Sequence, residues 1–464
     1  MKKLLFIVII LLTVFNYESG NVRADDKSVS KETRPNIVIF LADDLGWADV
    51  GWHGTEIKTP NLDRLASQGM RLERFYVQPV CSPTRASLMT GRYPIRYGLQ
   101  TGVIRPWADY GLSTDEQTLP QALHNNGYYT AILGKWHLGE VKKKYLPLQR
   151  GFDYHYGLYL GAIDYYEHNR DNGIDWHRNG QPVHEKGYST DLLAADAERL
   201  IKSYDNSKPL FLYIPFNAVH SPYQEVPEQK WKNQYAELQG KSQRKIYAGM
   251  VSTMDAAVGK VISALREKGL ADNTLIFFSS DNGGPNPKNV TDNGSLRAGK
   301  GTLYEGGIRV PAFAVWNGKI KPGTVSEQPI HITDLYPTLL KITGTTIEQK
   351  LPLDGADISA TLFENKPSAR TEILHNAETN RGALQRDHWK LVLTNLDKPK
   401  QIKKELFNLK DDPNEQNDLS TVHPDKLEEL IKRYENYAKN AVPALNKPKP
   451  ENFKPRNVWG DFND

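Results

Sequence analysis

The stretch NIVIFLA, residues 36–42, decides the fold class, because this continuous apolar run ends directly in two aspartates, Asp43 and Asp44. A strand that is buried on one face alternates apolar and polar residues, whereas a strand buried on both faces is apolar throughout. The run therefore predicts a strand in the interior of a parallel sheet, with two carboxylates at its carboxyl end.

Three further apolar runs of strand length also end in polar residues. They are YYTAILG (128–134), KPLFLYIPF (208–216) and NTLIFFSS (273–280), followed by KWHLG, NAVHSP and DNGG. Helical patterns separate the runs, one from Pro60 to about Gly69 and a long amphipathic one from Ile246 to Leu265. We predict an α/β fold, a mostly parallel sheet sandwiched by helices, with a ligand site beyond the carboxyl ends of its strands.

The texture of the chain changes after about residue 362. Residues 381–395 alternate like paired strands, and Pro424 to Asn440 has the pattern of a charged amphipathic helix. We predict a catalytic domain over 33–362, a smaller α+β C-terminal subdomain over 363–445, and a Pro- and Lys-rich tail over 446–464.

The N-terminus predicts export. Two lysines precede the apolar run 4–15, and Val22 and Ala24 lie at the small-residue positions before a cleavage site, which is typical of a signal peptide over 1–24. The run is short for a membrane span, so an uncleaved anchor is the weaker alternative and we expect no stable membrane anchor. The protein is then periplasmic or secreted. A net charge of +4, from 59 basic and 55 acidic residues, gives no reason to expect nucleic acid as a partner.

Cys81 is the single cysteine in 464 residues. Exported proteins often carry disulfides, but one cysteine has no internal partner. The sequence alone leaves open an intermolecular disulfide, a reactive thiol, a modified residue or a buried bystander.

The strand ends offer candidate site residues. Asp43 and Asp44, together with Asp281 and Asn282, provide hard oxygen donors that suit Ca²⁺ or Mg²⁺, although each pair alone also fits a simple turn. Lys135 and His137 lie two residues apart in a segment predicted to be extended, so we expect them on one face. Taken alone, each of them, and likewise His220 and Lys300, also fits a surface lysine or a structural histidine. The candidates of this second group are Lys135, His137, His220 and Lys300.

The segment CSPTRASLMTGR (81–92) contains C-x-P-x-R followed by G-R, and it resembles the signature of the sulfatases. Four more segments match family elements in the family's order: LADDLGW (41–47), GKWHLG (134–139), SDNGG (280–284) and GKGTLYEGGIRVP (299–311). The segments LPLQRGFDYHYGLYLGAIDYYEH and TLYEGGIRVP look most like the arylsulfatase B branch, the N-acetylgalactosamine-4-sulfatases. The resemblance implies a fold similar to that of alkaline phosphatases.

The resemblance also implies roles for the candidate residues. A maturation enzyme would convert Cys81 to formylglycine, whose hydrate is the nucleophile and whose second hydroxyl allows sulfate to leave by elimination. Ca²⁺, with Mg²⁺ the less expected ion, would be held at the converted Cys81 and at four oxygen-donor residues, and the other residues would act on the sulfate ester. The implied ligands are Asp43, Asp44, Asp281 and Asn282. Arg85 would hold the formylglycine, and Lys135 and Lys300 would bind the sulfate. His220 would act as the general acid and His137 as the base.

The expected substrate is a sulfated carbohydrate, with the 4-sulfate of galactose or N-acetylgalactosamine favoured by the resemblance. The aromatic segment 154–177 suits stacking on a sugar ring, or else it is a loop packed by its own tyrosines. Asp164, His168 and Arg381 are candidate sugar contacts. Two alternatives stay open: a phosphonate monoester or phosphodiester hydrolase of the same superfamily, and a non-catalytic glycan-binding protein whose cysteine is never converted.

Overall fold

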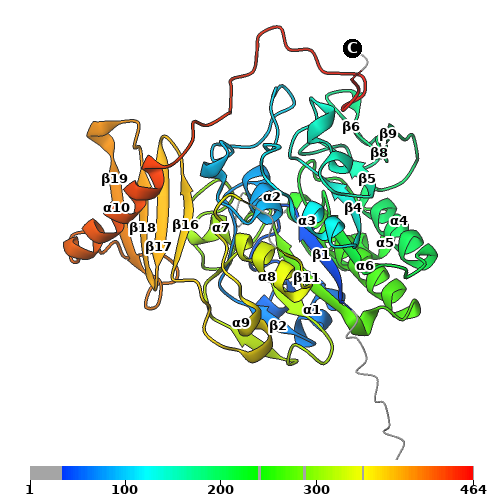
Figure 1. The fold of residues 1–464 in the computed structure, drawn as a ribbon, viewed down its shortest axis with the longest axis horizontal. Helices are drawn as coiled ribbons and strands as arrows, with labels where there is room; N and C mark the ends of the chain where they lie inside the picture. The colour runs from blue at the N-terminus through cyan, green and yellow to red at the C-terminus, as the bar shows by residue number, and fades with distance from the viewer. Residues whose placement is uncertain (1–33, 239–241, 286–288, 347–349, 463–464) are drawn as a thin grey trace, which may run out of the picture. The chain divides into compact units, whose positions relative to one another are not determined.

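The four apolar runs form neighbouring strands at the centre of a ten-stranded sheet (Figure 1). The computed structural model describes residues 34–238, 242–285, 289–346 and 350–462. Strands β11 (Thr274–Ser280), β1 (Asn36–Ala42), β10 (Leu210–Pro215) and β4 (Tyr129–Lys135) lie side by side in this order, and all three pairings are parallel. The predicted parallel core is therefore confirmed.

Shorter strands extend this sheet on both sides. Beyond β11 lie β13 (Phe313–Val315), β2 (Met70–Leu72) and β14 (Thr324–Ser326), and beyond β4 lie β5 (Tyr154–Leu158), β8 (His177–Arg178) and β9 (Gln181–Pro182). Four of these outer pairings are antiparallel, so the sheet is mixed at its margins. A second sheet joins β12 (Arg309–Val310), β3 (Phe75–Tyr76) and β15 (Ile330–His331).

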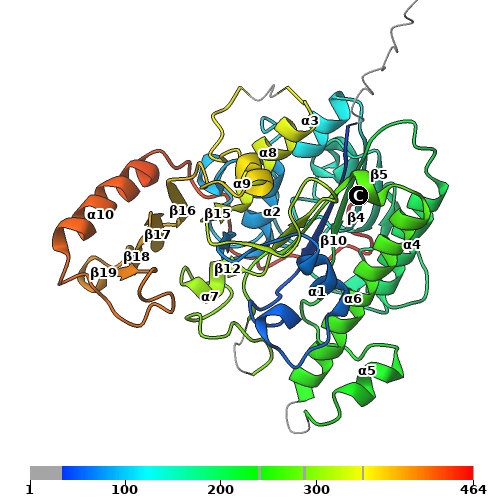
Figure 2. The same ribbon diagram turned by 90° about the horizontal axis from the view of Figure 1, so that it is seen from below.

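Successive residues of β1 enter two different hydrophobic cores, which explains why the run is apolar throughout. Val38 and Phe40 belong to the core under α1 (Pro60–Ser67), α4 (Ser189–Ser203) and α6 (Ser242–Glu267). Ile37, Ile39 and Leu41 belong to the opposite core under α2 (Cys81–Thr90), α3 (Leu119–Asn125), α8 (Leu335–Ile342) and α9 (Ser359–Glu364). Figure 2 shows α4 and α6 on one side of the strands and α3 and α8 on the other. The sheet is thus covered on both faces, as predicted.

Further short helices connect these elements. They are α5 (Gln229–Gln234), α7 (Glu305–Ile308) and the 3-10 helices Gly51–His53, Pro94–Arg96, Lys143–Tyr145, Pro147–Gln149, Ala271–Asn273, Ile332–Asp334 and Pro399–Gln401.

The C-terminal part contains its own antiparallel sheet. Strands β16 (Glu372–Ala377), β17 (Arg381–Arg386), β18 (Trp389–Thr394) and β19 (Lys403–Asn408) pair in sequence order, and α10 (Pro424–Lys439) packs on them through Leu430 and Tyr434. The expected smaller α+β part is confirmed. Residues from Arg34 onward form one compact unit, and the domain boundary at 362 stays a prediction.

The tail after α10 makes specific contacts that its composition did not indicate. It runs from α10 to the hairpin of β6 (Asn169–Arg170) and β7 (Gly173–Ile174), as the red trace in Figure 1 shows. There Ile174 N–H donates to Asn457 O, Trp459 N–H donates to Ile174 O, and the Trp459 side chain is fully buried. The signal peptide predicted over 1–24 lies outside the described residues, among which no helix is both long enough and apolar enough to cross a bilayer.

Candidate active site

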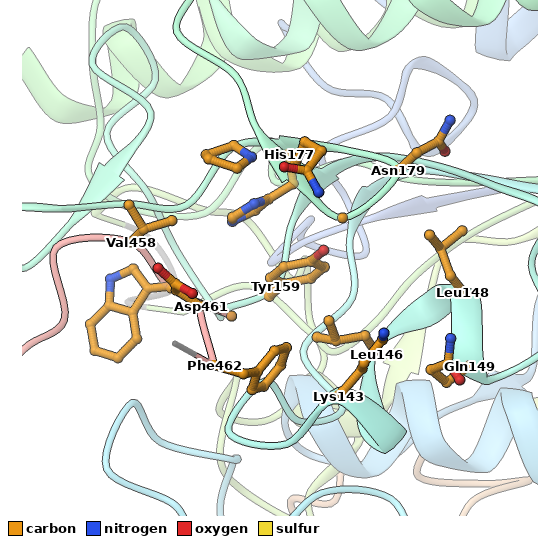
Figure 3. A pocket seen from close by; sticks show the side chains of 15 residues that line it. Lys143, Leu146, Leu148, Gln149, Tyr159, His177, Asn179, Val458, Asp461 and Phe462 are labelled. Atoms are coloured by element: carbon orange, nitrogen blue, oxygen red, sulfur yellow. The ribbon is translucent and has the colours of Figure 1, made fainter. Parts of the chain in front are cut away.

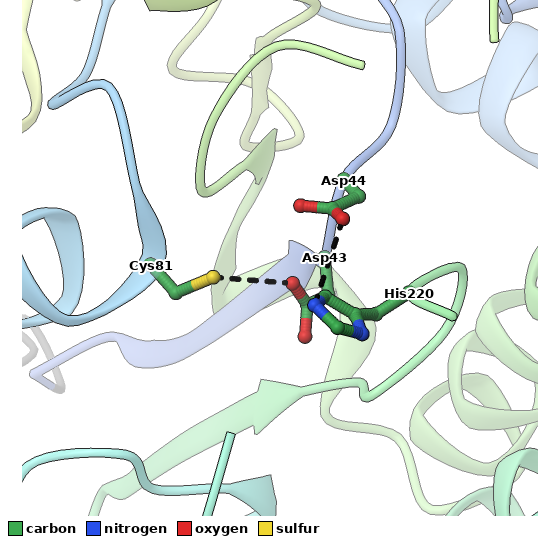
Figure 4. A group of neighbouring side chains, drawn as sticks. All are labelled: Asp43, Asp44, Cys81 and His220. Carbon is green, nitrogen blue, oxygen red and sulfur yellow. Dashed lines mark hydrogen bonds and ion pairs between the residues drawn. The ribbon is translucent and has the colours of Figure 1, made fainter. Parts of the chain in front are cut away.

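The carboxyl ends of the central strands deliver most of the predicted residues to one place. Asp43 and Asp44 follow β1, and Cys81 approaches from the first turn of α2. Figure 4 shows the Cys81 sulfur directed at the Asp43 carboxylate, with His220 beside Asp44. Ligand atoms of these four residues all lie within 4.8 Å of one another. The other members of the group are Asp281 and Asn282 after β11, Lys135 at the end of β4, and Lys300.

Cys81 occupies the first helical position of α2. Its Sγ lies 3.6 Å from Asp43 Oδ1 and 3.5 Å from Asn282 Oδ1. The N-terminus of a helix attracts anions through its free N–H groups and the helix dipole. Burial, and secondarily Asp281, raises the pKa of the thiol to about 12. The encoded cysteine is therefore protonated at neutral pH and is a poor nucleophile without chemical change.

Arg85 lies one helical turn after Cys81, on the same face of α2. Its Nε and one terminal nitrogen donate to Asp281 Oδ2 at 3.0 and 2.7 Å, and the other donates to Lys135 O at 2.8 Å. Because the guanidinium is almost fully buried, this pairing satisfies a charge that would otherwise be costly. The C-x-x-x-R spacing thus joins the helix to the ends of β11 and β4.

Two lysines pair with the two aspartates after β1. Lys135 Nζ lies 2.5 Å from Asp43 Oδ2, and Lys300 Nζ lies 2.6 Å from Asp44 Oδ1. Burial opposes ionisation of Asp43, but Lys135 and His220 outweigh it, and the pKa of Asp43 lies below its usual value. Burial likewise opposes the charge on Lys300, but Asp44 raises its pKa well above the usual value. Asp43 and Lys300, one member of each pair, are therefore charged at neutral pH.

The donor set fits a hard divalent cation. Asn282 Nδ2 donates to Asp44 Oδ1 at 2.7 Å, which leaves Asn282 Oδ1 on the side of Cys81. Carboxylate and amide oxygens are the ligands that Ca²⁺ and Mg²⁺ prefer. Both oxygens of Asp281 already have protein partners, because Arg85 donates to its Oδ2 and Asp44 N–H approaches its Oδ1 at 3.4 Å. Both oxygens of Asp44 likewise lie within 2.8 Å of Lys300 Nζ.

His137 reaches the site by a turn rather than by strand alternation. The extended segment ends at Lys135, and His137 itself has a φ of 58°, so the expected alternation does not apply. Its Nε2–H donates to Ile104 O at 2.9 Å, whereas Nδ1 is buried without a partner among the described residues. Burial, helped by Lys135 and Arg85, holds the pKa of His137 well below its usual value. A neutral imidazole with a free Nδ1 lone pair can accept a proton.

His220 follows β10 and is the more accessible histidine. Its Nδ1–H donates to Ser221 O at 2.5 Å, and its Nε2 lies 3.7 Å from Asp44 Oδ2. About a fifth of its side chain, 21%, is exposed, so its Nε2 can meet a substrate that enters from solvent.

Both histidines, Cys81 and Lys300 line one pocket of about 190 Å³. The pocket also takes in residues that sequence reasoning missed, because no motif marks them. These are Val80, residues 102–106 including Arg105, Gly161, Ala162 and Arg170. Their sequence signal was weak: Arg105 precedes the aromatic segment 154–177, and Arg170 lies within it.

Two of the three candidate sugar contacts are placed inside the aromatic segment. Asp164 Oδ1 accepts N–H bonds from the backbone of residues 166 and 167, and His168 is buried with its ring stacked on Trp176 at 4.7 Å. Neither lines the pocket. Most aromatic rings of the segment pack on one another. Within the segment, all of which the structure describes, Tyr166 is the one large hydrophobic residue that is exposed. The self-packed alternative therefore describes this segment best.

The third candidate, Arg381, connects β17 to the loop that carries Lys300. Arg381 donates to Gly301 O and pairs with Glu378 at 2.7 Å. A fully buried triad strengthens the same junction. In this triad Lys390 Nζ lies 2.8 Å from Glu305 and 2.7 Å from Glu415. Through these contacts the C-terminal sheet holds the loop that carries Lys300.

A larger cavity, of about 670 Å³, lies away from this chemistry. Figure 3 shows Tyr159 between the tail residues Val458 and Phe462 on one side and Leu148 on the other. The faces of Tyr159 are occupied by stacked imidazoles, with His177 at 4.2 Å. The cavity shares no residue with the pocket at Cys81 and marks where the tail packs.

Comparison with known proteins decides the family. The family model described as Sulfatase matches residues 35–345. The chain belongs to the sulfatase family. Mouse arylsulfatase J is 36% identical over 96% of this chain and 84% of its own length. Human N-acetylgalactosamine-6-sulfatase is 35% identical over 76% of this chain and 70% of its own length.

A solved structure matches the fold closely. The crystal structure of Ps i-CgsB in complex with k-i-k-neocarrahexaose has a TM-score of 0.82 and 33% identity, covering 89% of this chain and 94% of that chain. The predicted family and fold class are therefore confirmed, and the protein is a sulfuric ester hydrolase.

Proposed function

We propose that this sulfatase removes the 4-sulfate of a galactose or N-acetylgalactosamine unit in a sulfated glycan. Its nucleophile would be the hydrated formylglycine made from Cys81 by a maturation enzyme, and its resident ion Ca²⁺. Export through the predicted signal peptide would place it in the periplasm or outside the cell.

The observation that carries this proposal is the position of the Cys81 side chain. The sulfur stands at a helix N-terminus, within 3.6 Å of Asp43 Oδ1 and of Asn282 Oδ1, and it opens into the pocket with Lys300. Two buried cations, Arg85 and Lys135, and the partly exposed Lys300 lie around it, which is unusual for an inert cysteine and suits an anionic sulfate ester.

The ion would be held by oxygens of Asp43, Asp44, Asp281 and Asn282, and when bound it would supply positive charge that polarises the sulfate ester. A formylglycine hydrate would supply one hydroxyl for attack on sulfur and a second for release of sulfate by elimination. Lys135 and Lys300 would bind the sulfate oxygens, and Arg85 would fix the nucleophilic residue through its place on α2.

The two histidines suit opposite proton transfers. His220 Nε2 is accessible and lies 3.7 Å from Asp44 Oδ2, so it is placed to donate a proton to the departing sugar oxygen. His137 is neutral with a free Nδ1, so it can take the proton that must leave before sulfate is released. His220→Gln should therefore lose more activity on a glycan, a poor leaving group, than on an aryl sulfate.

A desulfation screen tests the proposal. Protein co-expressed with a maturation enzyme is supplied with Ca²⁺ and offered 4-sulfated and 6-sulfated galactose and N-acetylgalactosamine oligosaccharides. The 6-sulfated arm is essential, because a relative at 35% identity is named for the 6-position. Release of sulfate from the 4-position supports the proposal, and equal or faster release from the 6-position contradicts the regiochemistry. Alanine variants of the candidate sugar contacts Asp164, His168 and Arg381 are tested in the same screen.

Two measurements separate the alternatives. Competing rates on an aryl sulfate and an aryl phosphodiester distinguish a sulfatase from a phosphonate or phosphodiester hydrolase. The mass of the Cys81 peptide reports whether the residue is a thiol or an aldehyde, and an unconverted thiol that still binds glycan would indicate a binding protein.

A further inference from the structure

The rim of the Cys81 pocket carries two arginines that the sulfate chemistry does not use. Arg105 comes from the loop after α2, and Arg170 comes from the β6–β7 hairpin. Of the described residues that line the pocket, none is an aspartate or glutamate. The rim therefore presents positive charge that no acidic wall residue offsets.

The charges deeper in the site balance one another without these arginines. Each inner cation has a carboxylate partner: Arg85 with Asp281, Lys135 with Asp43, and Lys300 with Asp44. Arg105 has no ion pair within the described chain and lies 5.9 Å from the Trp107 ring. Among the described residues, Arg170 forms an ion pair only with its neighbour Asp171, at 3.4 Å, and both side chains are more than a third exposed. An exposed pair of this kind contributes little and leaves the guanidinium available.

Both arginines are carried by backbone that the C-terminal tail holds in place. Near Arg105, Trp107 Nε1 donates to Lys447 O at 3.1 Å, and Lys447 Nζ pairs with Asp109 at 2.8 Å. Ile104 N–H donates to Ser82 Oγ at 3.1 Å, which joins the same loop to α2.

On the other wall, the carbonyl of Arg170 itself accepts the Trp459 indole N–H at 2.9 Å. Arg456 O lies so close to Gly173 that a side chain there would collide with it. A pair of arginines on fixed backbone loses less freedom when it binds an anion than a pair on mobile loops.

We propose that Arg105 and Arg170 form a second anion-binding subsite, which receives another sulfate or carboxylate of the same glycan while the sulfate to be cleaved lies at Cys81. This inference rests on the proposed function, since it assumes that a sulfated glycan enters the pocket. It makes the preferred substrate a multiply charged oligosaccharide rather than an isolated sulfated sugar.

The test compares substrates that differ only in a second charge. Three disaccharides carry one cleavable sulfate each: one has no other charge, one has a second sulfate, and one has a uronic carboxylate. For the wild-type enzyme we expect kcat/KM to be about ten-fold higher or more for at least one doubly charged disaccharide, because a charge-assisted bidentate contact is worth roughly that factor. The two charged arms identify which group the subsite takes.

The double variant R105Q/R170Q should remove this preference. We expect its loss of kcat/KM on the preferred doubly charged substrate to exceed its loss on the singly charged one by about ten-fold, mainly through KM. The matched control R64Q/R266Q removes two exposed arginines from α1 and α6 that do not line the pocket, and it should keep the preference. Added salt should weaken the preference, since rim charges are screened.

Two results would overturn the proposal: a wild-type enzyme without preference for a second charge, or a double variant that loses equal activity on all three substrates. The failure of the proposed function is a different result, the absence of sulfate release from any glycan. In that case the subsite is tested by calorimetric binding of the same disaccharides. Tighter binding of a doubly charged disaccharide to the wild-type protein, and loss of that difference in R105Q/R170Q, would support the proposal.

Discussion

Replacing Lys390 by methionine tests whether the C-terminal sheet supports the active-site loop through buried charge. Lys390, Glu305 and Glu415 are all fully buried, and Tyr76 OH donates to Glu305 at 3.0 Å. Methionine keeps the length of the side chain and removes the ammonium. It leaves Glu415 without the cation that pairs with it, whereas Glu305 keeps a more distant one, Arg309 at 3.8 Å.

The magnitude follows from the burial of the triad. Removing one partner of a buried ion pair costs about 3–5 kcal/mol of unfolding free energy, because the remaining charge is neither solvated nor paired. Burial already raises the pKa of Glu415 to about 7, so this group takes up a proton most readily and limits the loss. A raised folded-state pKa stabilises at low pH and loses that effect as pH rises. We therefore expect about 3 kcal/mol of destabilisation at pH 8 and less at pH 6.

Urea denaturation followed by tryptophan fluorescence measures this loss at both pH values. Lys403→Met is the matched control, because Lys403 also lies 2.7 Å from a glutamate, Glu405, but its side chain is 54% exposed. An exposed pair is worth about 0–1 kcal/mol. Glu405 also keeps the hydrogen bond from Tyr304 OH.

A loss below about 1 kcal/mol for Lys390→Met, or one no larger than that of the control, would refute this reasoning. The double variant K390M/E415Q provides an internal check, because neutralising Glu415 removes one stranded charge and should recover part of the stability.

Three further predictions concern other parts of the molecule. Burial, with Asp175, raises the pKa of Glu140 to about 8. Between about pH 5 and pH 8 the wild-type protein should therefore lose about 3 kcal/mol of unfolding free energy that the Glu140→Gln variant does not lose. Parallel pH profiles of Tm for the two proteins would contradict this prediction. Trp459→Ala should free the tail, because the indole is fully buried and donates to the Arg170 carbonyl. We expect faster tryptic cleavage after Arg456 and a higher KM for charged glycans, and an unchanged cleavage rate would count against this prediction. EGTA should lower the Tm of the wild-type protein and Ca²⁺ should restore it, because an ion that binds only the folded state stabilises that state. The Tm of the Asp44→Asn variant should respond only weakly to either reagent. A wild-type Tm that neither reagent changes would contradict the ion site.

Patterns that depend on local rules were readable from the sequence. The continuous apolar runs correctly predicted parallel strands buried on both faces, and the polar residues at their ends converge as the edge rule requires. The C-x-x-x-R spacing is one helical turn, and it places Arg85 under Cys81.

Features that depend on tertiary contacts were not readable. All ten residues of α2 are buried, yet they include Ser, Thr and Arg, so no apolar stripe marked the helix. His137 owes its position to a backbone turn with positive φ, which an extended pattern does not predict. Arg170 and Trp459 lie 289 positions apart, and nothing in either local sequence indicates their bond.

That separation has a consequence for the order in which the active site is assembled. A ribosome adds about 5–20 residues per second, so roughly 15–60 s pass between the synthesis of the hairpin and that of the tryptophan that ties it down. The central strands and the acidic cluster are made well before that moment. The tryptophan that fixes the rim of the pocket is therefore synthesised after every residue of the reactive floor, so the wall proposed to select a glycan receives its support last.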